Sequence, residues 1–366
     1  MKTRIGLVVL SLFLSLLIGI SLGNRHSGAS SGKDAKDTGV VIGLSMDTLQ
    51  EARWQADRDI FVARAEELGA SVLVQSANSD DTRQMQDIQS LISNRVDVLV
   101  IVPHNGKAMA RAVKLAHEAG IPVIAYDRLI NDSELDLYIS FNNIRVGELQ
   151  AQFLVQHLPK NRPARIVRLY GAKTDHNSFL FKQGQDNVLQ PLIDAGDIIV
   201  LHEDWAENWK PENAKKITNA AITRHGTDFD AILSSNDGMA GGAIQALREE
   251  GIAGKILVTG QDAELVACQR IVAGQQAMSI YKPIRNLATQ AAEYAVKLAR
   301  GKPVIVRDSM FNGLIDVPSV LLDVITVTRD NIRETVIADG FHSYEDVYRS
   351  IPASQRPPRL HSQEHP

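Results

Sequence analysis

The 366-residue sequence contains a single cysteine, Cys268, and no run of more than two basic residues. One cysteine excludes an internal disulfide framework, and its helix-like surroundings predict a small buried hydrophobe. Without a basic stripe the chain lacks the electrostatic footprint of nucleic-acid binding, so nucleic acid is not an expected partner. The remaining composition, 44% hydrophobic and 22% charged with a formal charge of −4, is ordinary for a globular chain whose length favours two domains.

Signatures of other function classes are also missing. Asp127, Asp262 and Lys282 have acid–base chemistry, but no metal-ligand set or P-loop accompanies them. The spacing of the C-terminal histidines fits no standard metal site. The space where a sugar-responsive repressor would carry a helix-turn-helix holds an apolar segment instead. We therefore expect a protein that is not an enzyme, with no catalytic residue, no metal and no cofactor.

The N-terminal segment has a membrane-targeting pattern. Lys2 and Arg4 precede an uncharged apolar run over residues 5–22, and this basic end is expected to stay cytoplasmic. As a helix the run would span about 27 Å at ~1.5 Å per residue, close to the thickness of a bilayer core. Residues 1–23 are therefore a cleaved signal peptide or a retained membrane anchor, and no cysteine follows directly for lipid attachment. Residues 24–39 predict a flexible linker.

From residue 40 onward, short β-branched runs alternate with longer amphipathic stretches. The first series predicts strands at 40–45, 71–76, 96–102 and 122–126, with helices at 54–68, 81–93 and 107–119. The second predicts strands at 164–170, 198–202, 229–234, 255–259 and 277–281, with helices at 146–157, 179–193, 212–224, 239–250 and 265–273. A long helix at 284–300 follows. This rhythm predicts an α/β protein with two doubly wound parallel-sheet domains.

The expected domains are discontinuous in sequence. Residues 40–145 and 283–313 are assigned to the N-terminal domain, and residues 146–282 and 314–342 to the C-terminal domain. The proline-containing segment 343–366 is expected to be a mobile tail.

Polar residues follow seven of the expected strands, at the carboxyl ends where ligands meet parallel sheets. These segments are 46–55, 126–128, 171–177, 204–209, 235–237, 260–262 and 281–283. Their charges nearly balance, since Asp127, Asp237 and Asp262 stand against Arg53, Arg128 and Lys282. Such a mixture of donors and acceptors suits the hydroxyls of a neutral sugar, and tryptophan suits its C–H faces.

Each residue also has a structural interpretation. Asp127 and Arg128 could form a strand-end salt bridge, and Trp54 or Trp205 could be a core residue. One of Asn236 and Asp237 is expected to cap the following helix. Their joint placement at strand ends from both halves favours a binding site.

Ten short segments carry a resemblance to a known family. They are 52–62 (ARWQADRDIFV), 72–78 (VLVQSAN), 125–132 (AYDRLIND), 138–142 (YISFN), 146–151 (VGELQA), 209–214 (WKPENA), 235–237 (SND), 240–247 (AGGAIQAL), 260–263 (GQDA) and 281–284 (YKPI). On these residues the chain from 40 to 342 resembles the bacterial D-xylose-binding proteins of the ribose-binding-like periplasmic group. The resemblance implies the type I periplasmic binding protein fold, with a hinge between the two domains.

The resemblance also implies a site between the domains and D-xylose as the ligand. Matched by position, the sugar contacts would be Arg53, Asp127, Arg128, Asn177, Asn236, Asp262 and Lys282, with Trp54 and Trp209 on the two faces of the ring. The residue before Asn177 departs from the family pattern, so no contact is expected of His176.

The family further implies an extracytoplasmic location, in the periplasm or on the outer face of the cell membrane, and a membrane partner for the closed form. That partner is the permease of an ABC sugar importer or a sensor histidine kinase of a two-component system. An uncleaved apolar segment would contact the membrane and supports the sensor, while the family as a whole favours import as the primary role.

Overall fold

The computed structural model describes residues 39–359. The expected signal or anchor at 1–23, the expected linker up to residue 38, and residues 360–366 lie outside the described residues. No helix within the described residues combines the length and the apolar character needed to cross a membrane.

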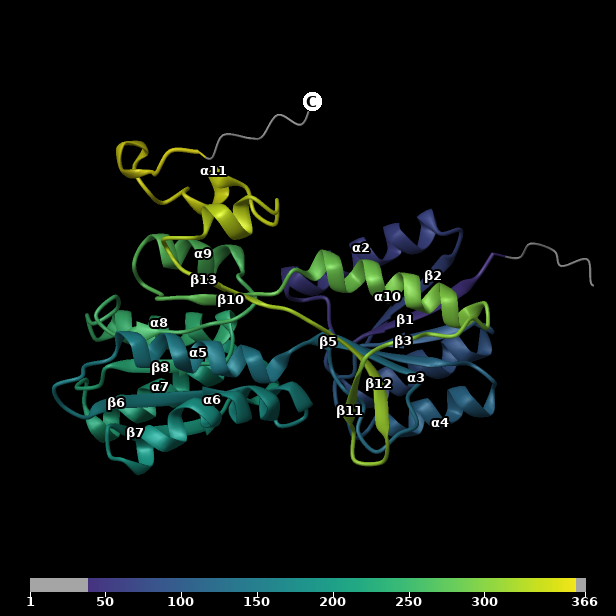
Figure 1. Cartoon of the computed structure of the whole chain (residues 1–366), viewed down its shortest axis with the longest axis horizontal. Helices are drawn as coiled ribbons and strands as arrows, with labels where there is room; N and C mark the ends of the chain where they lie inside the picture. The colour runs from purple at the N-terminus through teal and green to yellow at the C-terminus, as the bar shows by residue number, and fades with distance from the viewer. Residues whose placement is uncertain (1–38, 360–366) are drawn as a thin grey trace, which may run out of the picture. The chain divides into compact units, whose positions relative to one another are not determined.

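The larger sheet of the described chain has seven strands in the order β11-β12-β5-β4-β3-β1-β2 (Figure 1). They are β1 (Val41–Met46), β2 (Ser71–Ser76), β3 (Val98–Ile101), β4 (Val123–Tyr126), β5 (Leu137–Phe141), β11 (Asp308–Phe311) and β12 (Asp316–Leu322). All neighbours pair in parallel except β11 and β12, an antiparallel hairpin at the edge. The inner strands β3, β4 and β5 are buried at every position, as their apolar sequences predict for a sheet covered on both faces.

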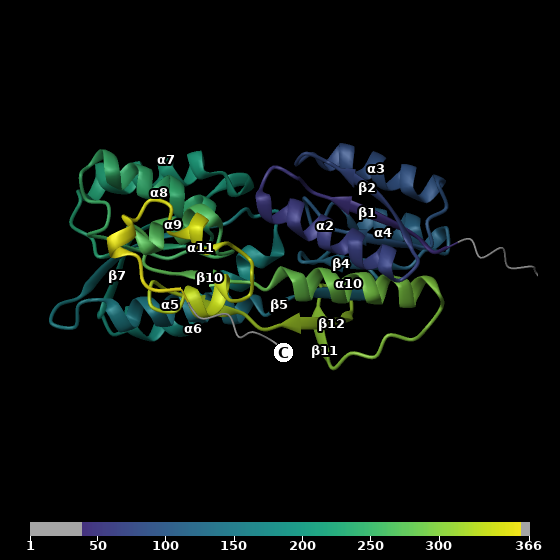
Figure 2. The ribbon, with the colours of Figure 1, turned by 90° about the horizontal axis from the view of Figure 1, so that it is seen from above.

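Helices cover both faces of this sheet (Figure 2). They are α2 (Ala52–Glu67) and α10 (Ile284–Ala299) on one face, and α3 (Asp81–Ser93) and α4 (Ala110–Glu118) on the other. Because successive strand residues point to opposite faces, Val100 packs with Phe61 of α2 while its neighbour Leu99 packs with Leu91 of α3. We call this sheet and its helices the first lobe.

The second lobe is built around a four-stranded parallel sheet in the order β7-β6-β8-β9. Its strands are β6 (Ala164–Tyr170), β7 (Ile198–Trp205), β8 (Ala231–Ser234) and β9 (Leu257–Val258). One face packs against α7 (Pro211–His225) and α8 (Asp237–Glu249), and the other against α5 (Asn143–His157) and α6 (His176–Asp194). Beside them lie α9 (Leu265–Val272) and an antiparallel pair, β10 (Ser279–Tyr281) with β13 (Ile325–Val327).

The predicted fold class is confirmed. Between residues 39 and 359 the chain passes from one lobe to the other three times, after β5, after β10 and after β12. These three connecting segments join the lobes, and the hinge that the family resemblance implies would lie in them.

The assignment of residues 314–342 to the C-terminal domain is wrong for β12. This strand pairs in parallel with β5 of the first lobe, with Ser319 opposite Tyr138. Only β13 pairs with a strand next to the second lobe. Strand pairing is decided by contacts far away in the sequence, so a local pattern identifies a strand without identifying its partner. The other domain boundaries stay predictions.

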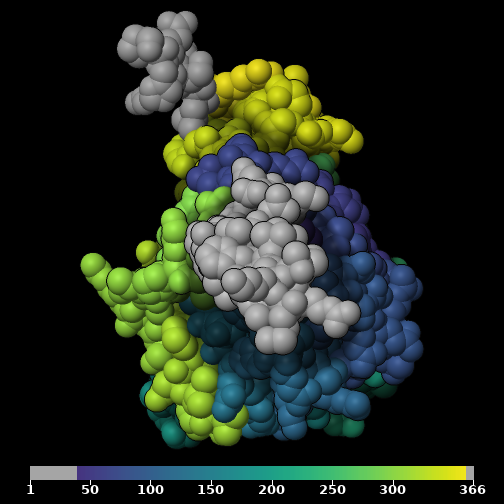
Figure 3. Space-filling model, turned by 90° about the vertical axis from the view of Figure 1, so that its right-hand side faces the viewer, coloured from purple at the N-terminus to yellow at the C-terminus, as the bar shows by residue number. Residues whose placement is uncertain are grey.

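The prediction of a mobile tail from residue 343 is also wrong within the described residues. Ser343 caps the short helix α11 (Tyr344–Val347), and Val347 and Tyr348 are buried together with Cys268 of α9. Figure 3 shows the residues at the yellow end of the colour scale gathered in one compact region. The apolar side chains within this proline-containing segment hold it in place. Cys268 itself is a buried free thiol, as predicted.

Candidate functional site

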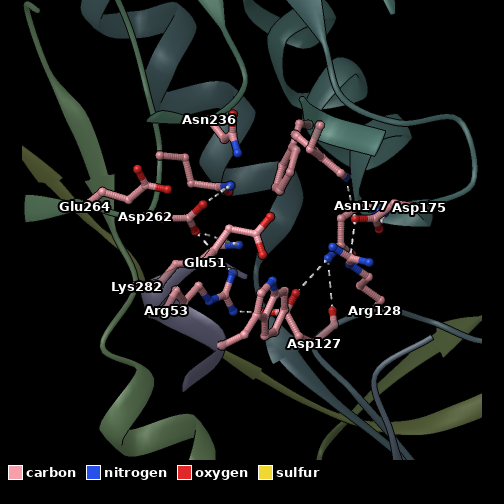
Figure 4. A pocket seen from close by; sticks show the side chains of 14 residues that line it. Glu51, Arg53, Asp127, Arg128, Asp175, Asn177, Asn236, Asp262, Glu264 and Lys282 are labelled. Atoms are coloured by element: carbon pink, nitrogen blue, oxygen red, sulfur yellow. Dashed lines mark hydrogen bonds and ion pairs between the residues drawn. The ribbon is translucent and has the colours of Figure 1, made fainter. Parts of the chain in front are cut away.

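A pocket collects charged and aromatic side chains from the carboxyl ends of both parallel sheets (Figure 4). Its empty volume is about 470 Å³, including the part that is open to solvent. It is lined by Glu51, Arg53, Trp54, Asp127, Arg128, Asp175, Asn177, Phe181, Trp209, Asn236, Gln261, Asp262, Glu264 and Lys282.

Arg53 links the two lobes across this pocket. It lies in the first turn of α2, and its side chain is only 9% exposed. The guanidinium contacts Asp57 one turn further along (Nε–Oδ2 3.3 Å), Asp127 after β4, and Asp262 after β9 (Nη1–Oδ1 3.2 Å). Five N–H donors fixed in one plane allow a single guanidinium to bridge several carboxylates. Asp127 belongs to the first lobe and Asp262 to the second, so both lobes hold the same cation.

Arg128 forms a second link. Its Nη1 lies 2.6 Å from Oδ2 of Asp47, which follows β1 in the first lobe. Its Nε lies 3.0 Å from Oδ2 of Asp175, which follows β6 in the second lobe. His104 contacts the other oxygen of Asp47 at 2.9 Å. The guanidinium of Arg128 is therefore neutralised within its own lobe and also across the pocket.

Several pocket residues have a backbone conformation that side chains disfavour. The φ angles of Asp127, Trp209 and Asp262 are +61°, +60° and +92°. A non-glycine residue in this left-handed region costs of order 1–3 kcal/mol and persists only where the surroundings hold it. The Ser140 hydroxyl donates to the carbonyl of Asp127 at 2.6 Å, and the amide of Asp262 donates to the carbonyl of Ile280 at 2.7 Å. The strain places these side chains toward the pocket.

Two asparagines contribute amide groups. The Nδ2 of Asn177, at the start of α6, donates to the carbonyl of Asp127 at 3.0 Å, which is a further contact between the lobes. The Oδ1 of Asn236 accepts from the amide of Met239 at 2.9 Å and caps α8. The prediction that Asn236 or Asp237 caps this helix is confirmed, and Figure 4 shows that the capping residue also faces the pocket.

The indole of Trp209 forms one wall of the pocket. The ring lies so close over Gly171 that a Cβ atom there would overlap it. Its Nε1 donates to Oδ2 of Asp175 at 3.2 Å. Phe181 meets the ring edge-on, with 6.2 Å between centroids. A flat aromatic face held on one side by the backbone is suited to the C–H face of a sugar ring.

The other two tryptophans have different environments. Trp54 lines the pocket beneath two cations, with the guanidinium carbons of Arg53 and Arg128 at 4.4 and 5.3 Å from its ring centroid. Trp205 is not among the lining residues, and its ring packs on Tyr170 with 4.9 Å between centroids. The structure therefore brings Trp54 and Trp209 to the pocket and leaves Trp205 outside it.

Lys282 is a buried ammonium group that follows β10. Its side chain is 2% exposed, and Nζ lies 3.9 Å from Oδ1 of Asp262 and 5.2 Å from the ring centroid of Phe181. Burial lowers the pKa of Lys282, although Asp127 opposes this effect. Burial likewise acts to raise the pKa of Asp127, but Arg53 and Lys282 together hold it below its usual value. Asp127 is therefore an ionised acceptor.

The pKa of Glu264 lies near neutrality. Burial, followed by the charge of Asp262, raises the pKa of Glu264 to about 7. Arg270 opposes this shift, and Glu51, at the N-terminus of α2 in the first lobe, adds to it. The side chain can therefore donate or accept a hydrogen bond near neutral pH.

All nine residues predicted from the sequence as ligand contacts line this one pocket. The structure adds Glu51, Asp175, Phe181, Gln261 and Glu264. Four of these five lie within two positions of a predicted contact, so the strand-end rule could have found them. Phe181 lies on the buried face of α6 and has no sequence signal that distinguishes it from a core residue. His176 lines a different groove, together with Phe179.

In the part of the chain that the structure describes, no group of three or more His, Cys, Asp or Glu side chains is arranged to hold a metal ion.

A family model described as the periplasmic binding protein domain matches residues 42–303. The chain belongs to the periplasmic binding protein family. This match covers most of both lobes and agrees with the doubly wound architecture of the two sheets.

Individual members of the family are similar over nearly their whole length. The chain is 48% identical over 319 residues to a D-xylose-binding periplasmic protein of Haemophilus influenzae, covering 87% of this chain and 95% of the relative. It is 49% identical over 308 residues to a D-xylose-binding periplasmic protein of Escherichia coli, covering 84% and 92%. The resemblance inferred from the sequence is confirmed, and these relatives are binding proteins rather than enzymes.

A solved structure has a similar fold. A carbohydrate transporter solute binding protein from Chloroflexus aurantiacus, in complex with D-glucose, superposes with a TM-score of 0.79 at 32% identity. The match covers 83% of this chain and 97% of that chain.

Proposed function

We propose that this periplasmic binding protein captures D-xylose in the pocket between its lobes and presents it to a membrane partner outside the cytoplasm. The observation that carries the proposal is the convergence of nine predicted contacts on one pocket, together with the similarity to D-xylose-binding relatives. The nine are Arg53, Trp54, Asp127, Arg128, Asn177, Trp209, Asn236, Asp262 and Lys282.

The chemistry of the pocket supports a neutral sugar. Each hydroxyl both donates and accepts, so carboxylates such as Asp127 and cations such as Lys282 serve the same ligand. Arg53 and Arg128 already have carboxylate partners from both lobes, which leaves little uncompensated positive charge for an anionic ligand. Trp54 and Trp209 supply aromatic surface for the ring.

Ligand capture requires the lobes to move, and the contacts across the pocket support closure. The Arg53–Asp262 and Arg128–Asp175 pairs join residues of different lobes. When the hinge opens, these pairs separate and their groups return to water. A bound sugar stabilises the closed form because it adds contacts to both lobes at once.

The ABC importer is the partner that we favour, in line with the family. A sensor histidine kinase is the alternative, because the apolar segment at 5–22 is long enough to anchor the protein beside such a kinase. The mass of the mature protein purified from its host shows whether the N-terminal segment is retained as an anchor or cleaved. Cleavage near residue 24 would remove the main argument for a role beside a sensor histidine kinase.

Isothermal titration of the protein with D-xylose tests the ligand. One-to-one binding is expected, with weaker binding of ribose and glucose. Absence of heat with xylose, together with tight binding of another sugar, would overturn the proposed ligand. In the host, loss of the gene should reduce uptake of labelled xylose. Intact uptake with loss of xylose-dependent transcription would instead favour the sensor.

A further inference from the structure

The loop between α10 and β11, residues 300–307, exposes a large apolar side chain. Val304 and Val306 pack against the core of the first lobe. Ile305 lies between them in the sequence and is 88% exposed, the largest exposed fraction of any large apolar side chain in the described residues. Single exposed apolar residues are common on protein surfaces, so this feature alone identifies no partner.

Basic residues flank this side chain and give the loop a positive charge. Residues 297–307, which are the last turn of α10 and the loop after it, contain Lys297, Arg300, Lys302 and Arg307 and no acidic residue. All four side chains are exposed, and none of them forms an ion pair within the described residues. The positive charge of this segment is therefore available to a partner.

Acidic residues on the two neighbouring helices do not neutralise the segment. Glu67 of α2 and Glu293 of α10 lie in the C-terminal halves of these helices. Both pair with Arg64, at 2.9 and 2.7 Å, and Arg64 is not part of the segment. Each carboxylate thus already has a cation of its own.

The segment lies at the end of the first lobe where the described chain begins. Nη2 of Arg300 donates to the carbonyl of Leu68 at 3.1 Å, and the amide of Ser71 donates to the carbonyl of Val40 at 2.8 Å. Figure 2 shows the start of β1 and the C-terminal end of α10 at the same end of the lobe. Figure 3 views the protein from that side and shows light-green residues projecting from its outline.

The predicted linker keeps this end of the lobe close to the apolar segment. Residues 24–39 separate the described chain from the apolar run at 5–22. A flexible linker of that length spans about 22 Å on average, which is less than the roughly 35 Å width of a lobe. With the apolar run in a bilayer, this end of the first lobe is the part that stays nearest the headgroups.

We propose that residues 297–307 form a lipid-contact surface of the full chain. Ile305 enters the headgroup region of the bilayer, and the four cations bind anionic headgroups. Apolar side chains among lysines and arginines are typical of segments that lie in a membrane interface. Each cation near an anionic surface strengthens the attraction roughly fivefold. The contact orients the first lobe on the membrane and leaves the second lobe free to close. It goes beyond xylose binding and does not rest on it.

A labelled full chain, placed in lipid nanodiscs through its apolar segment, measures the contact. Ile305→Cys carries an environment-sensitive maleimide dye, while Cys268 is buried and stays unlabelled, which the unaltered protein checks. Ile199→Cys is the matched control, because Ile199 is an exposed isoleucine on β7 of the second lobe. The nanodiscs contain phosphatidylcholine with or without phosphatidylglycerol. Spin-labelled lipid quenches a dye that reaches the headgroups.

In nanodiscs with phosphatidylglycerol, quenching at position 305 should exceed quenching at position 199 roughly threefold or more. The excess should disappear in phosphatidylcholine alone, which has no net headgroup charge. It should also fall as the salt concentration rises, because salt screens the attraction between exposed charges.

Reversal of charge tests whether the cations hold the loop on the lipid. Lys302→Glu combined with Arg307→Glu should remove the excess quenching of the dye at position 305. Lys216→Glu combined with Arg224→Glu is the matched control, since both residues are exposed on α7 of the second lobe and the change in net charge is the same. This control should leave the quenching unchanged.

Three outcomes would overturn the proposal. They are equal quenching at the two labelled positions, quenching that persists after the reversal at 302 and 307, and a contact that forms in native membranes but not in lipid-only nanodiscs. The last would show that a protein covers the loop. Xylose binding is measured on the same samples, and its absence would count against the proposed function alone, because residues 297–307 do not line the pocket.

Discussion

Arg53 and Asp262 lie 209 positions apart in the sequence, yet Nη1 of the arginine is 3.2 Å from Oδ1 of the aspartate across the pocket. Arg53 begins a helix of the first lobe, and Asp262 follows a strand of the second. The pair thus reports on closure, because it forms only when the lobes meet. Both side chains are about nine-tenths buried, so water screens the interaction little.

Asp262→Asn removes the charge of this pair and should weaken xylose binding by at least about 2 kcal/mol, roughly 30-fold, because Arg53 and Lys282 lose a shared buried partner. Titration calorimetry measures the change. Glu67→Gln is the matched control, since Glu67 pairs with Arg64 on the exposed surface at 2.9 Å and such pairs contribute less than about 1 kcal/mol. Equal affinity of the two variants would show that Asp262 does not support closure.

Trp209→Ala should weaken xylose binding about 100-fold, because a buried aromatic wall at a binding site commonly contributes 2 kcal/mol or more. Trp205→Ala should change the affinity less than about fivefold, because its ring packs on Tyr170 and Phe179 outside the pocket. Both are measured by calorimetry, at a temperature where circular dichroism shows each variant folded. The opposite order would mean that the stacking residue is assigned wrongly.

Glu264 makes xylose binding depend on pH. Its pKa of about 7 in the structure, against an ordinary 4.5, results from burial, Asp262 and Glu51 of the facing lobe, with Arg270 and Arg53 acting in the opposite direction. Opening the lobes exposes Glu264 and removes Glu51, so its pKa falls toward the ordinary value. The closed form therefore binds a proton more readily than the open form. Affinity should rise as the pH falls through about 7, and the stability contributed by the protonated carboxyl is lost as the pH rises through the same range.

Calorimetry with xylose at several pH values between about 5.5 and 8 checks this dependence, and a several-fold change is expected. Glu264→Gln, which cannot titrate, should flatten the profile. The same slope in both proteins would assign the pH dependence to another group.

The sequence predicted most of this pocket because its residues obey a geometric rule. The carboxyl ends of parallel strands meet at one edge of a sheet, so Asn236 and Asp262 of the second lobe could be placed together by this rule. Their meeting with Asp127 of the first lobe was implied by the family resemblance. Phe181 was not predicted as a pocket residue, because an apolar residue on a helix face gives the same sequence pattern whether it faces a core or a ligand. The sequence also did not predict which strand pairs with β12 or how Tyr348 packs, because both depend on contacts between segments that are distant in the sequence.

Gly171→Ala tests whether the indole of Trp209 must stay where it is. A methyl group at 171 would overlap the ring, so the indole has to move into the space of the sugar. Xylose affinity should fall roughly tenfold or more, because overpacking typically costs 1–3 kcal/mol. Gly238→Ala is the matched control: its Cβ would lie 3.8 Å from Asn236 and Pro211, which is ordinary contact, and alanine suits the first turn of α8. Xylose affinity is measured for both variants, and only that of Gly171→Ala should fall. Wild-type affinity in Gly171→Ala would mean that the ring has room to shift and that its close approach to the backbone does not shape the site.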